Sequence, residues 1–141
     1  MVEKTSDVQQ RAEQMTSLRT EYVGKAVLVE SVYYGQVRDI VGKLDKVDPY
    51  GYVSIAGERV PFVGFGCAIR QILLADKNTF TKNPTVLYDN TKNIPKDYDT
   101  REIPAVAKIV EKSFGSTVAD EFKTGYAKFE NDLAEAGKKF K

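Results

Sequence analysis

The chain of 141 residues contains no histidine and a single cysteine, Cys67. Without histidine, catalytic triads that use it and zinc sites of the cysteine–histidine kind cannot form. One cysteine excludes an internal disulfide and is compatible with a reducing compartment, and we expect it to be a small buried thiol. Most familiar catalytic constellations are therefore excluded, and no cofactor or metal site is predicted.

Long apolar runs and a strong charge imbalance are also lacking. The polar residues 2–14 do not resemble a secretory signal, and no apolar run approaches the roughly 20 residues needed to span a bilayer. The net charge is +1, so any nucleic-acid binding must come from a local patch. With 42% hydrophobic residues, the composition predicts a folded globule. We therefore expect a cytoplasmic protein with no membrane contact.

What the chain does contain is a series of five short segments rich in β-branched and aromatic residues. They cover residues 25–34, 36–47, 52–56, 59–63 and 68–74. Gly42 inside the second segment predicts a bulge or a sharp bend, and Pro61 predicts that the fourth is an edge strand or is paired only in part. The pattern favours a mainly β fold, a small and strongly bent five-stranded SH3-like barrel.

Helical patterns flank this β-rich region. Residues 6–20 carry apolar side chains at helical spacing, and Ser6 with Gln9 matches a capping box. Ile103–Phe114 predicts a helix with Pro104 in its first turn, and a second helix begins at Ser116 or Thr117. The chain is thus predicted to consist of a helix plus barrel and a C-terminal helical extension.

A polar connecting segment separates the two helical regions. Residues 77–101 are dominated by Asn, Lys, Thr, Asp and two prolines, which predicts a surface connection. Within it, Val86–Tyr88 is a candidate short extra strand. The expected divisions are residues 1–76, 77–101 and 102–141.

The turn between the second and third segments is the strongest functional lead. In Asp48-Pro49-Tyr50-Gly51, proline presets φ and glycine takes a positive φ, as in a tight turn. The alternation that follows predicts that Asp48, Tyr50 and Tyr52 point outward together.

Two motifs resemble the Sm-like (Lsm) protein family, in its archaeal form. Gly42-x-Leu44 followed by Asp48 and Tyr50 is similar to the first Sm motif, and the run from Val63 through Gly66 to Ile72 is similar to the second. The resemblance covers roughly residues 6–75, about half of the chain. It implies a bent five-stranded barrel that assembles as a homo-oligomer, a ring of six or seven subunits in which strand four pairs with strand five of the next copy.

The resemblance also implies a binding site for single-stranded, uridine-rich RNA at the pore of that ring. The RNA-binding positions fall on Asp48, Tyr50, Tyr52, Phe65 and Gly66. Tyr52 and Phe65 stand where the family has Asn and Arg, and losing those groups removes hydrogen bonds to the base. Aromatic rings still stack on bases without sequence choice, so weakened base specificity is predicted. Arg38, Lys43 and Lys46 are near enough to assist with phosphates.

Two other readings remain open. The ring could be a scaffold without RNA binding, with the C-terminal helices recruiting a protein partner or joining two stacked rings. An enzyme is not predicted, because the carboxylate pairs Asp45/Asp48 and Asp97/Asp99 are typical of solvated turns. No glycine-rich phosphate loop is present either, since Gly64-Phe-Gly66 lacks a third glycine and a following helix.

Overall fold

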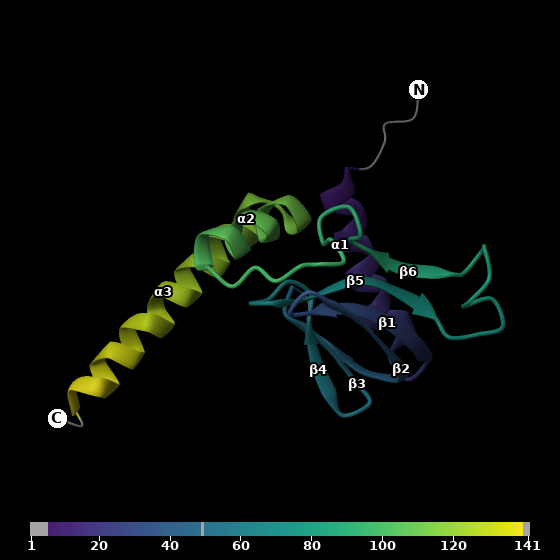
Figure 1. Cartoon of the computed structure of the whole chain (residues 1–141), viewed down its shortest axis with the longest axis horizontal. Coiled ribbons are helices and arrows are strands. Elements are labelled where there is room, and N and C mark those ends of the chain that lie inside the picture. Colours follow the sequence, from purple (N-terminus) through teal and green to yellow (C-terminus); the bar gives the residue numbers. More distant parts are fainter. Residues whose placement is uncertain (1–5, 49, 140–141) are drawn as a thin grey trace.

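The computed structural model describes residues 6–48 and 50–139, with side chains described up to Lys128. The chain forms one sheet and three helices. The helices are α1 (Asp7–Ser17), which continues into a π-helical turn η1 (Leu18–Tyr22), α2 (Ile103–Phe114) and α3 (Ser116–Lys139). The strands are β1 (Ala26–Tyr33), β2 (Gln36–Val47), β3 (Tyr52–Ile55), β4 (Glu58–Pro61), β5 (Cys67–Leu74) and β6 (Val86–Asp89). Figure 1 shows α2 above one end of the sheet and α3 running away from it. The fold is therefore mixed α/β.

The six strands form one antiparallel sheet in the order β4-β3-β2-β1-β5-β6. The five predicted strands are confirmed in position, and the candidate strand at Val86–Tyr88 is confirmed as β6. The predicted strongly bent five-stranded barrel is confirmed only in part, because the strands belong to a six-stranded sheet that does not close into a barrel. The sheet curls until Val63 bridges to Ala68, but β6 takes the outer edge of β5 from Gln71 to Leu73, and no ladder joins β4 to β5 along its length.

β2 contains an irregularity, but it does not lie at Gly42, where the sequence predicts a bulge or bend. β2 pairs with β1 as far as Lys43 and with β3 from Leu44 onward, and the register shifts between Leu44 and Lys46. Gly42 itself pairs regularly with Val27. β4 is an edge strand, in agreement with the missing backbone donor of Pro61.

One apolar core lies between the sheet and the helices. Its sheet side includes Val29, Leu44, Ile55 and Ile72, all fully buried, and the helices add residues such as Val106. At the start of α1, the hydroxyl of Ser6 accepts from the N–H of Gln9 at 3.1 Å, so Ser6 acts as the N-cap that the sequence predicts.

A buried arginine of α1 holds α2 in place. Arg11 is only 5% exposed, and its Nε donates to the carbonyl of Ser113 at 2.7 Å. A second donor, Nη2, reaches the carbonyl of Lys112 at 3.2 Å. These carbonyls lie at the C-terminal end of α2, where helical partners are lacking and a cation is favourable. The contact fixes the position of α2 over the sheet.

The segment 77–101, expected to be a surface connection, also enters the core. It contributes β6, and it buries Tyr88, Ile94 and Tyr98. The N–H of Gly35 donates to the carbonyl of Tyr98 at 2.9 Å, and the hydroxyl of Tyr98 donates to the carbonyl of Gly64 at 2.6 Å. We call residues 90–101 the strap, because they tie the β1–β2 turn to the loop before β5.

Candidate nucleic-acid interface

The three residues predicted at the β2–β3 turn do not share one environment. The backbone closes the turn, since the N–H of Asp48 donates to the carbonyl of Tyr52 at 2.8 Å; Pro49 lies outside the described residues. The ring of Tyr50 faces α2, with its centroid 5.3 Å from that of Phe114. Tyr52 instead lies among cations of the sheet. Asp48 is exposed beside them.

The two residues predicted at the second motif are covered. The ring of Phe65 packs on Phe122 and Tyr126 of α3, at centroid distances of 5.9 and 5.2 Å. Gly66 is buried, and its N–H donates to the carbonyl of Thr100 in the strap at 2.7 Å.

The two predicted turns are neighbours, as the resemblance implies. The carbonyl of Gly51 accepts from the N–H of Phe62 at 3.0 Å, which joins the β2–β3 turn to the segment before β5. Helices α2 and α3 lie over the aromatic rings of this region. The face that the resemblance assigns to RNA is therefore occupied in part by the chain's own helices.

Tyrosines and cations instead meet along the side of the sheet. Two cations lie over the ring of Tyr52. The Nζ atom of Lys46 is 5.8 Å from the ring centroid, and the Cζ atom of Arg59 is 5.0 Å from it. Beyond Arg59, the surface continues through a hollow to Tyr33 of β1. We call this surface the tyrosine–cation belt; its members are Lys46, Tyr52, Arg59, Arg38, Tyr33, Tyr34 and Arg101.

The far end of the belt is the β1–β2 turn. The rings of Tyr33 and Tyr34 meet edge to face with centroids 4.3 Å apart, and the guanidinium carbon of Arg101 lies 4.2 Å from the centroid of Tyr34. Each contact is of the cation–π or aromatic kind. The contacts form two groups, one around Tyr52 and one around Tyr34, and Arg59 and Tyr33 line the hollow that lies between the groups.

Tyr34 adopts a backbone conformation that a tyrosine rarely takes. Its φ is +50°, and that of Gly35 is +82°, as required at both central positions of a type I′ hairpin turn. Asparagine or glycine is the usual residue at the first of these positions, and a bulky residue there is strained. The ring of Tyr34 lies against Gly66, so that this conformation fixes an aromatic ring at the surface.

A hollow of about 330 Å³ opens in the middle of the belt. Its floor is formed by buried residues, Ser31, Ile40 and Val60. Its rim carries the more exposed side chains, Tyr33, Arg38, Glu58, Arg59 and Cys67. Burial raises the pKa of the Cys67 thiol, and the charge of Arg38 lowers it by less, so the surroundings favour the protonated thiol over the thiolate.

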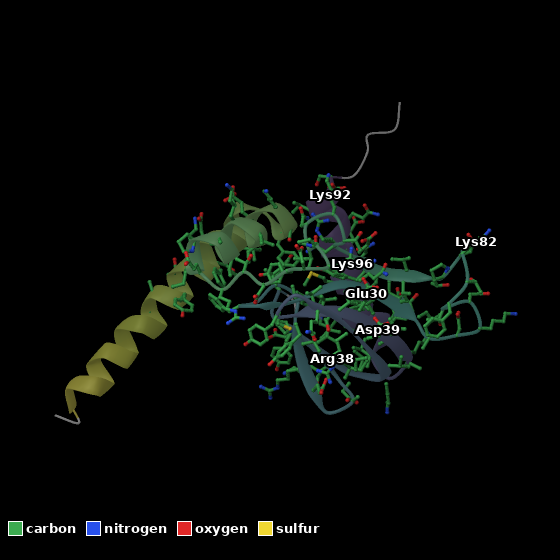
Figure 2. The ribbon with its side chains drawn as sticks, viewed as in Figure 1. Glu30, Arg38, Asp39, Lys82, Lys92 and Lys96 are labelled. Atoms are coloured by element: carbon green, nitrogen blue, oxygen red, sulfur yellow. The ribbon has the colours of Figure 1, made fainter. Side chains whose placement is uncertain are left out.

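Two of the belt's cations have carboxylate partners, and both pairs are exposed. Arg38 Nη2 lies 2.6 Å from Oε1 of Glu58, with side-chain exposures of 54% and 41%. Arg101 Nε lies 2.9 Å from Oδ1 of Asp99. Exposed pairs of this kind contribute about 0–1 kcal/mol, so a phosphate can compete for the guanidinium groups. Figure 2 labels Arg38 among the lower strands in that view and Lys92 near the top.

Sequence reasoning identified part of this belt. Tyr52 was predicted as a site residue, and Arg38 and Lys46 as residues assisting with phosphates. Tyr33, Tyr34, Arg59 and Arg101 were missed. A signal was available for the tyrosines, since Tyr-Tyr-Gly stands where the chain must turn between two strands.

Comparison with family models, with curated proteins and with solved structures gave no match to this chain. None of the described helices combines the length and apolarity needed to cross a bilayer. Within the part of the chain that the structure describes, no group of three His, Cys, Asp or Glu side chains could hold a metal ion. The geometry of the belt is therefore the basis for a functional proposal.

Proposed function

We propose that this protein binds single-stranded RNA along the tyrosine–cation belt, on an Sm-like sheet, with stacking and phosphate contacts as the main sources of affinity. The proposal rests on one observation, the two groups of tyrosine and cation contacts around Tyr52 and Tyr34, which lie on either side of one hollow. Single-stranded nucleic acid is bound by this combination, because every base has a face that stacks on an aromatic ring and every phosphate attracts a cation. The proposal assigns no catalytic step to the protein.

The Sm-like relationship draws support from the strand order. A curled antiparallel sheet that contains the order β5-β1-β2-β3-β4, with β6 outside β5, and that follows an N-terminal helix is compatible with the bent five-stranded unit that the two motifs imply. The proposed RNA path differs from the one implied by the family, since Tyr50 and Phe65 pack against α2 and α3. Asp48 and Gly66 would act near the path, Asp48 at its edge and Gly66 by supporting Tyr34.

The implied ring of six or seven subunits needs the outer edge of β5 for the next copy. In this chain β6 pairs with that edge at Gln71, Ile72 and Leu73. Ring assembly through β4 and β5 would require β6 to leave, so we propose that the belt binds RNA within a single subunit. The mass in solution, measured by light scattering, tests this: one subunit is expected, and six or seven would overturn it.

The binding test is a fluorescence anisotropy titration with labelled oligouridine at low salt, where phosphate contacts are strongest. We expect binding that weakens as salt is added. The double variant Tyr33→Ala/Arg59→Gln should lose at least about tenfold in affinity, because a stacking ring and a phosphate contact are removed. The control is Lys92→Gln, which removes an exposed cation that pairs with Asp7, away from the belt. Absence of binding by the unaltered protein at low salt would refute the proposal.

A second candidate, a scaffold that recruits a protein or a second copy through the C-terminal helices, is favoured by the shape of α3. This helix extends to Lys139 and runs away from the sheet (Figure 1). Its contacts with the body include those of Phe122 and Tyr126 on Phe65. A chain ending at Lys128 keeps these contacts, whereas one ending at Asp76 would remove β6 and buried strap residues.

The scaffold candidate is tested by comparing the masses of the full chain and the chain ending at Lys128. If α3 joins copies, the full chain forms an assembly and the shortened chain does not. Equal masses at the level of one subunit would exclude self-assembly through α3. RNA binding should be the same in both chains if the belt is the RNA site.

A further inference from the structure

We infer that the hollow in the belt is a pocket for a single guanine base, read by the carboxylate of Glu58 and the guanidinium of Arg38. This inference rests on the proposed RNA binding and assigns base specificity to it. It differs from the uridine preference that the resemblance to the Sm-like family implies.

The size and lining of the hollow suit one base. Its volume of about 330 Å³ lies at the small end of the usual range for small-molecule sites. Ile40 and Val60 give the floor an apolar surface, and both are less than 10% exposed, at 8% and 5%. The ring of Tyr33 is 51% exposed and lies at the rim of the hollow. There it can stack on the bound base or on the next base of the RNA.

The polar groups of the rim occur in an order that matches one base edge. Oε1 of Glu58 accepts from Nη2 of Arg38, and Oε2 has no hydrogen-bond partner among the described residues. The pair thus offers two neighbouring acceptors, Oε1 and Oε2 of Glu58, and beside them the N–H donors of Arg38. The Watson–Crick edge of guanine presents the 2-amino donor, the N1–H donor and the O6 acceptor. The two sets are complementary.

The other bases do not fit this order. An ionised carboxylate only accepts hydrogen bonds, so it needs two neighbouring donors on the base. Uracil has one ring N–H between two carbonyl oxygens, and adenine and cytosine each have an amino group beside an unprotonated ring nitrogen. Each of them would place an acceptor against a carboxylate oxygen. Arginine also pairs with guanine O6 in many nucleic-acid complexes.

The charged groups of the pocket already face each other before a base enters. Glu58 forms an exposed ion pair with Arg38, and Arg38 has further N–H donors beyond the one that Glu58 uses. The hydroxyl of Ser31 is engaged with the carbonyl of Arg38 at 3.1 Å, which fixes the backbone beneath the pair. The backbone of Arg38 is therefore fixed, and both charged side chains are accessible to a base.

The first experiment compares short oligonucleotides on the unaltered protein. Oligouridine, the same sequence with one central guanosine, and that sequence with inosine in place of guanosine are titrated by fluorescence anisotropy. We expect guanosine to tighten binding by about tenfold or more over uridine, in line with a good bidentate base contact. Inosine lacks the 2-amino group, so it should lose most of this gain. Equal affinities for the guanosine and inosine oligonucleotides would overturn the inference.

The second experiment changes the protein. Glu58→Gln replaces one carboxylate oxygen by an amide donor, which opposes a guanine donor, and it removes a negative charge from the belt. We expect the preference for guanosine to fall to less than about threefold, while oligouridine binds slightly more tightly. The matched control is Glu111→Gln on the exposed side of α2, where the preference should be kept. Retention of the full preference in Glu58→Gln would overturn the inference.

The outcomes separate this inference from the proposed function. If oligouridine binds with the expected salt dependence and guanosine gives no advantage, RNA binding along the belt is supported and the guanine pocket is refuted. If none of the oligonucleotides binds at low salt, the proposed function fails and the pocket falls with it. A guanosine preference that disappears in Glu58→Gln and is kept in Glu111→Gln supports both the proposed RNA binding and the guanine pocket.

Discussion

Two turns of the same sheet each carry a tyrosine with a positive φ, and they illustrate how neighbours decide the role of an exposed ring. Tyr34 in the β1–β2 turn has φ +50°, and Tyr50 in the β2–β3 turn has φ +62°. Their exposed fractions are also alike, at 44% and 41%. Over Tyr34 lies the guanidinium of Arg101, whereas Tyr50 faces the buried ring of Phe114. Exposure alone therefore does not separate a binding surface from a packing contact.

The chemistry of the two neighbours explains the difference. Phe114 gives Tyr50 an apolar contact that exists without any ligand, so its ring stabilises the attachment of α2 to the sheet. The guanidinium of Arg101 lies over the ring of Tyr34 and can also bind a phosphate. The ring and the guanidinium together therefore suit a nucleotide. The same residue type in a similar conformation therefore has an apolar neighbour in one turn and a cationic neighbour in the other.

The largest expected effect comes from removing the ring that faces Tyr50. Phe114→Ala should lower the free energy of unfolding by about 3–5 kcal/mol, because Phe114 is buried and its ring also packs on Phe62 at 6.4 Å. Urea denaturation followed by circular dichroism measures this. Phe80→Ala is the control, since Phe80 is 84% exposed and its removal should change stability by less than about 0.5 kcal/mol. Equal effects of the two changes would contradict the packing role.

A second change acts on the Tyr34 side. In Gly66→Ala the new Cβ would lie 2.6 Å from Cε1 of Tyr34, at a φ of +73°, so we expect a loss of about 2–3 kcal/mol. Gly57→Ala is a matched control with a φ of +77° and no heavy atom within 4 Å of the new Cβ. It should cost about 1 kcal/mol from backbone strain alone. Thermal denaturation of the two variants isolates the contact with Tyr34.

The third prediction compares the two turns by RNA binding. Tyr33→Ala removes a ring at the hollow and should weaken oligouridine binding by about tenfold, a typical loss for one stacking contact. Tyr50→Ala should change the affinity by less than about twofold, because its ring faces α2. Anisotropy titrations at low salt provide both values. A larger loss of affinity in Tyr50→Ala than in Tyr33→Ala would indicate that RNA binds at the β2–β3 turn instead.

The smallest expected effect concerns the strap that holds the loop beneath Tyr34. Tyr98→Phe removes the hydrogen bond to the carbonyl of Gly64 and should cost about 1 kcal/mol at neutral pH. Burial raises the pKa of Tyr98 to about 12 from an ordinary value of 10.0. The unfolded chain therefore loses this proton at lower pH than the folded chain.

The sign of the pH effect follows from that difference. The contribution of Tyr98 to stability is complete below about pH 10 and is lost as the pH rises toward 12. Denaturation midpoints measured across this interval should fall less steeply for Tyr98→Phe than for the unaltered protein. Parallel curves would show that Tyr98 ionises as easily in the folded chain as in the unfolded one.

Much of the fold follows from local sequence patterns. The bounds predicted for α2, Ile103–Phe114, match the structure, because an early proline and a closing glycine mark both ends. The strands were found from their β-branched residues and turns, and the edge position of β4 from Pro61. The pairing of β6 with β5 was not predicted, because four residues in a polar segment do not indicate which edge they will join.

The candidate site was predictable only where its contacts are local. Tyr52 and Lys46 lie in adjacent strands of one hairpin, so the turn pattern brings them together. Arg101 reaches Tyr34 because the strap crosses the end of β1, which is a tertiary contact between distant parts of the chain. Likewise, the sequence does not show that α2 would cover Tyr50.

The pairing of β6 with β5 has a kinetic consequence for assembly. Since both strands belong to one polypeptide, β6 is present near β5 at an effective concentration in the millimolar range, about that of a short tethered segment. A neighbouring copy at micromolar concentration cannot compete with it. Any subunit exchange through this edge must begin with local unfolding of β6, so it would be slow and would resemble domain swapping.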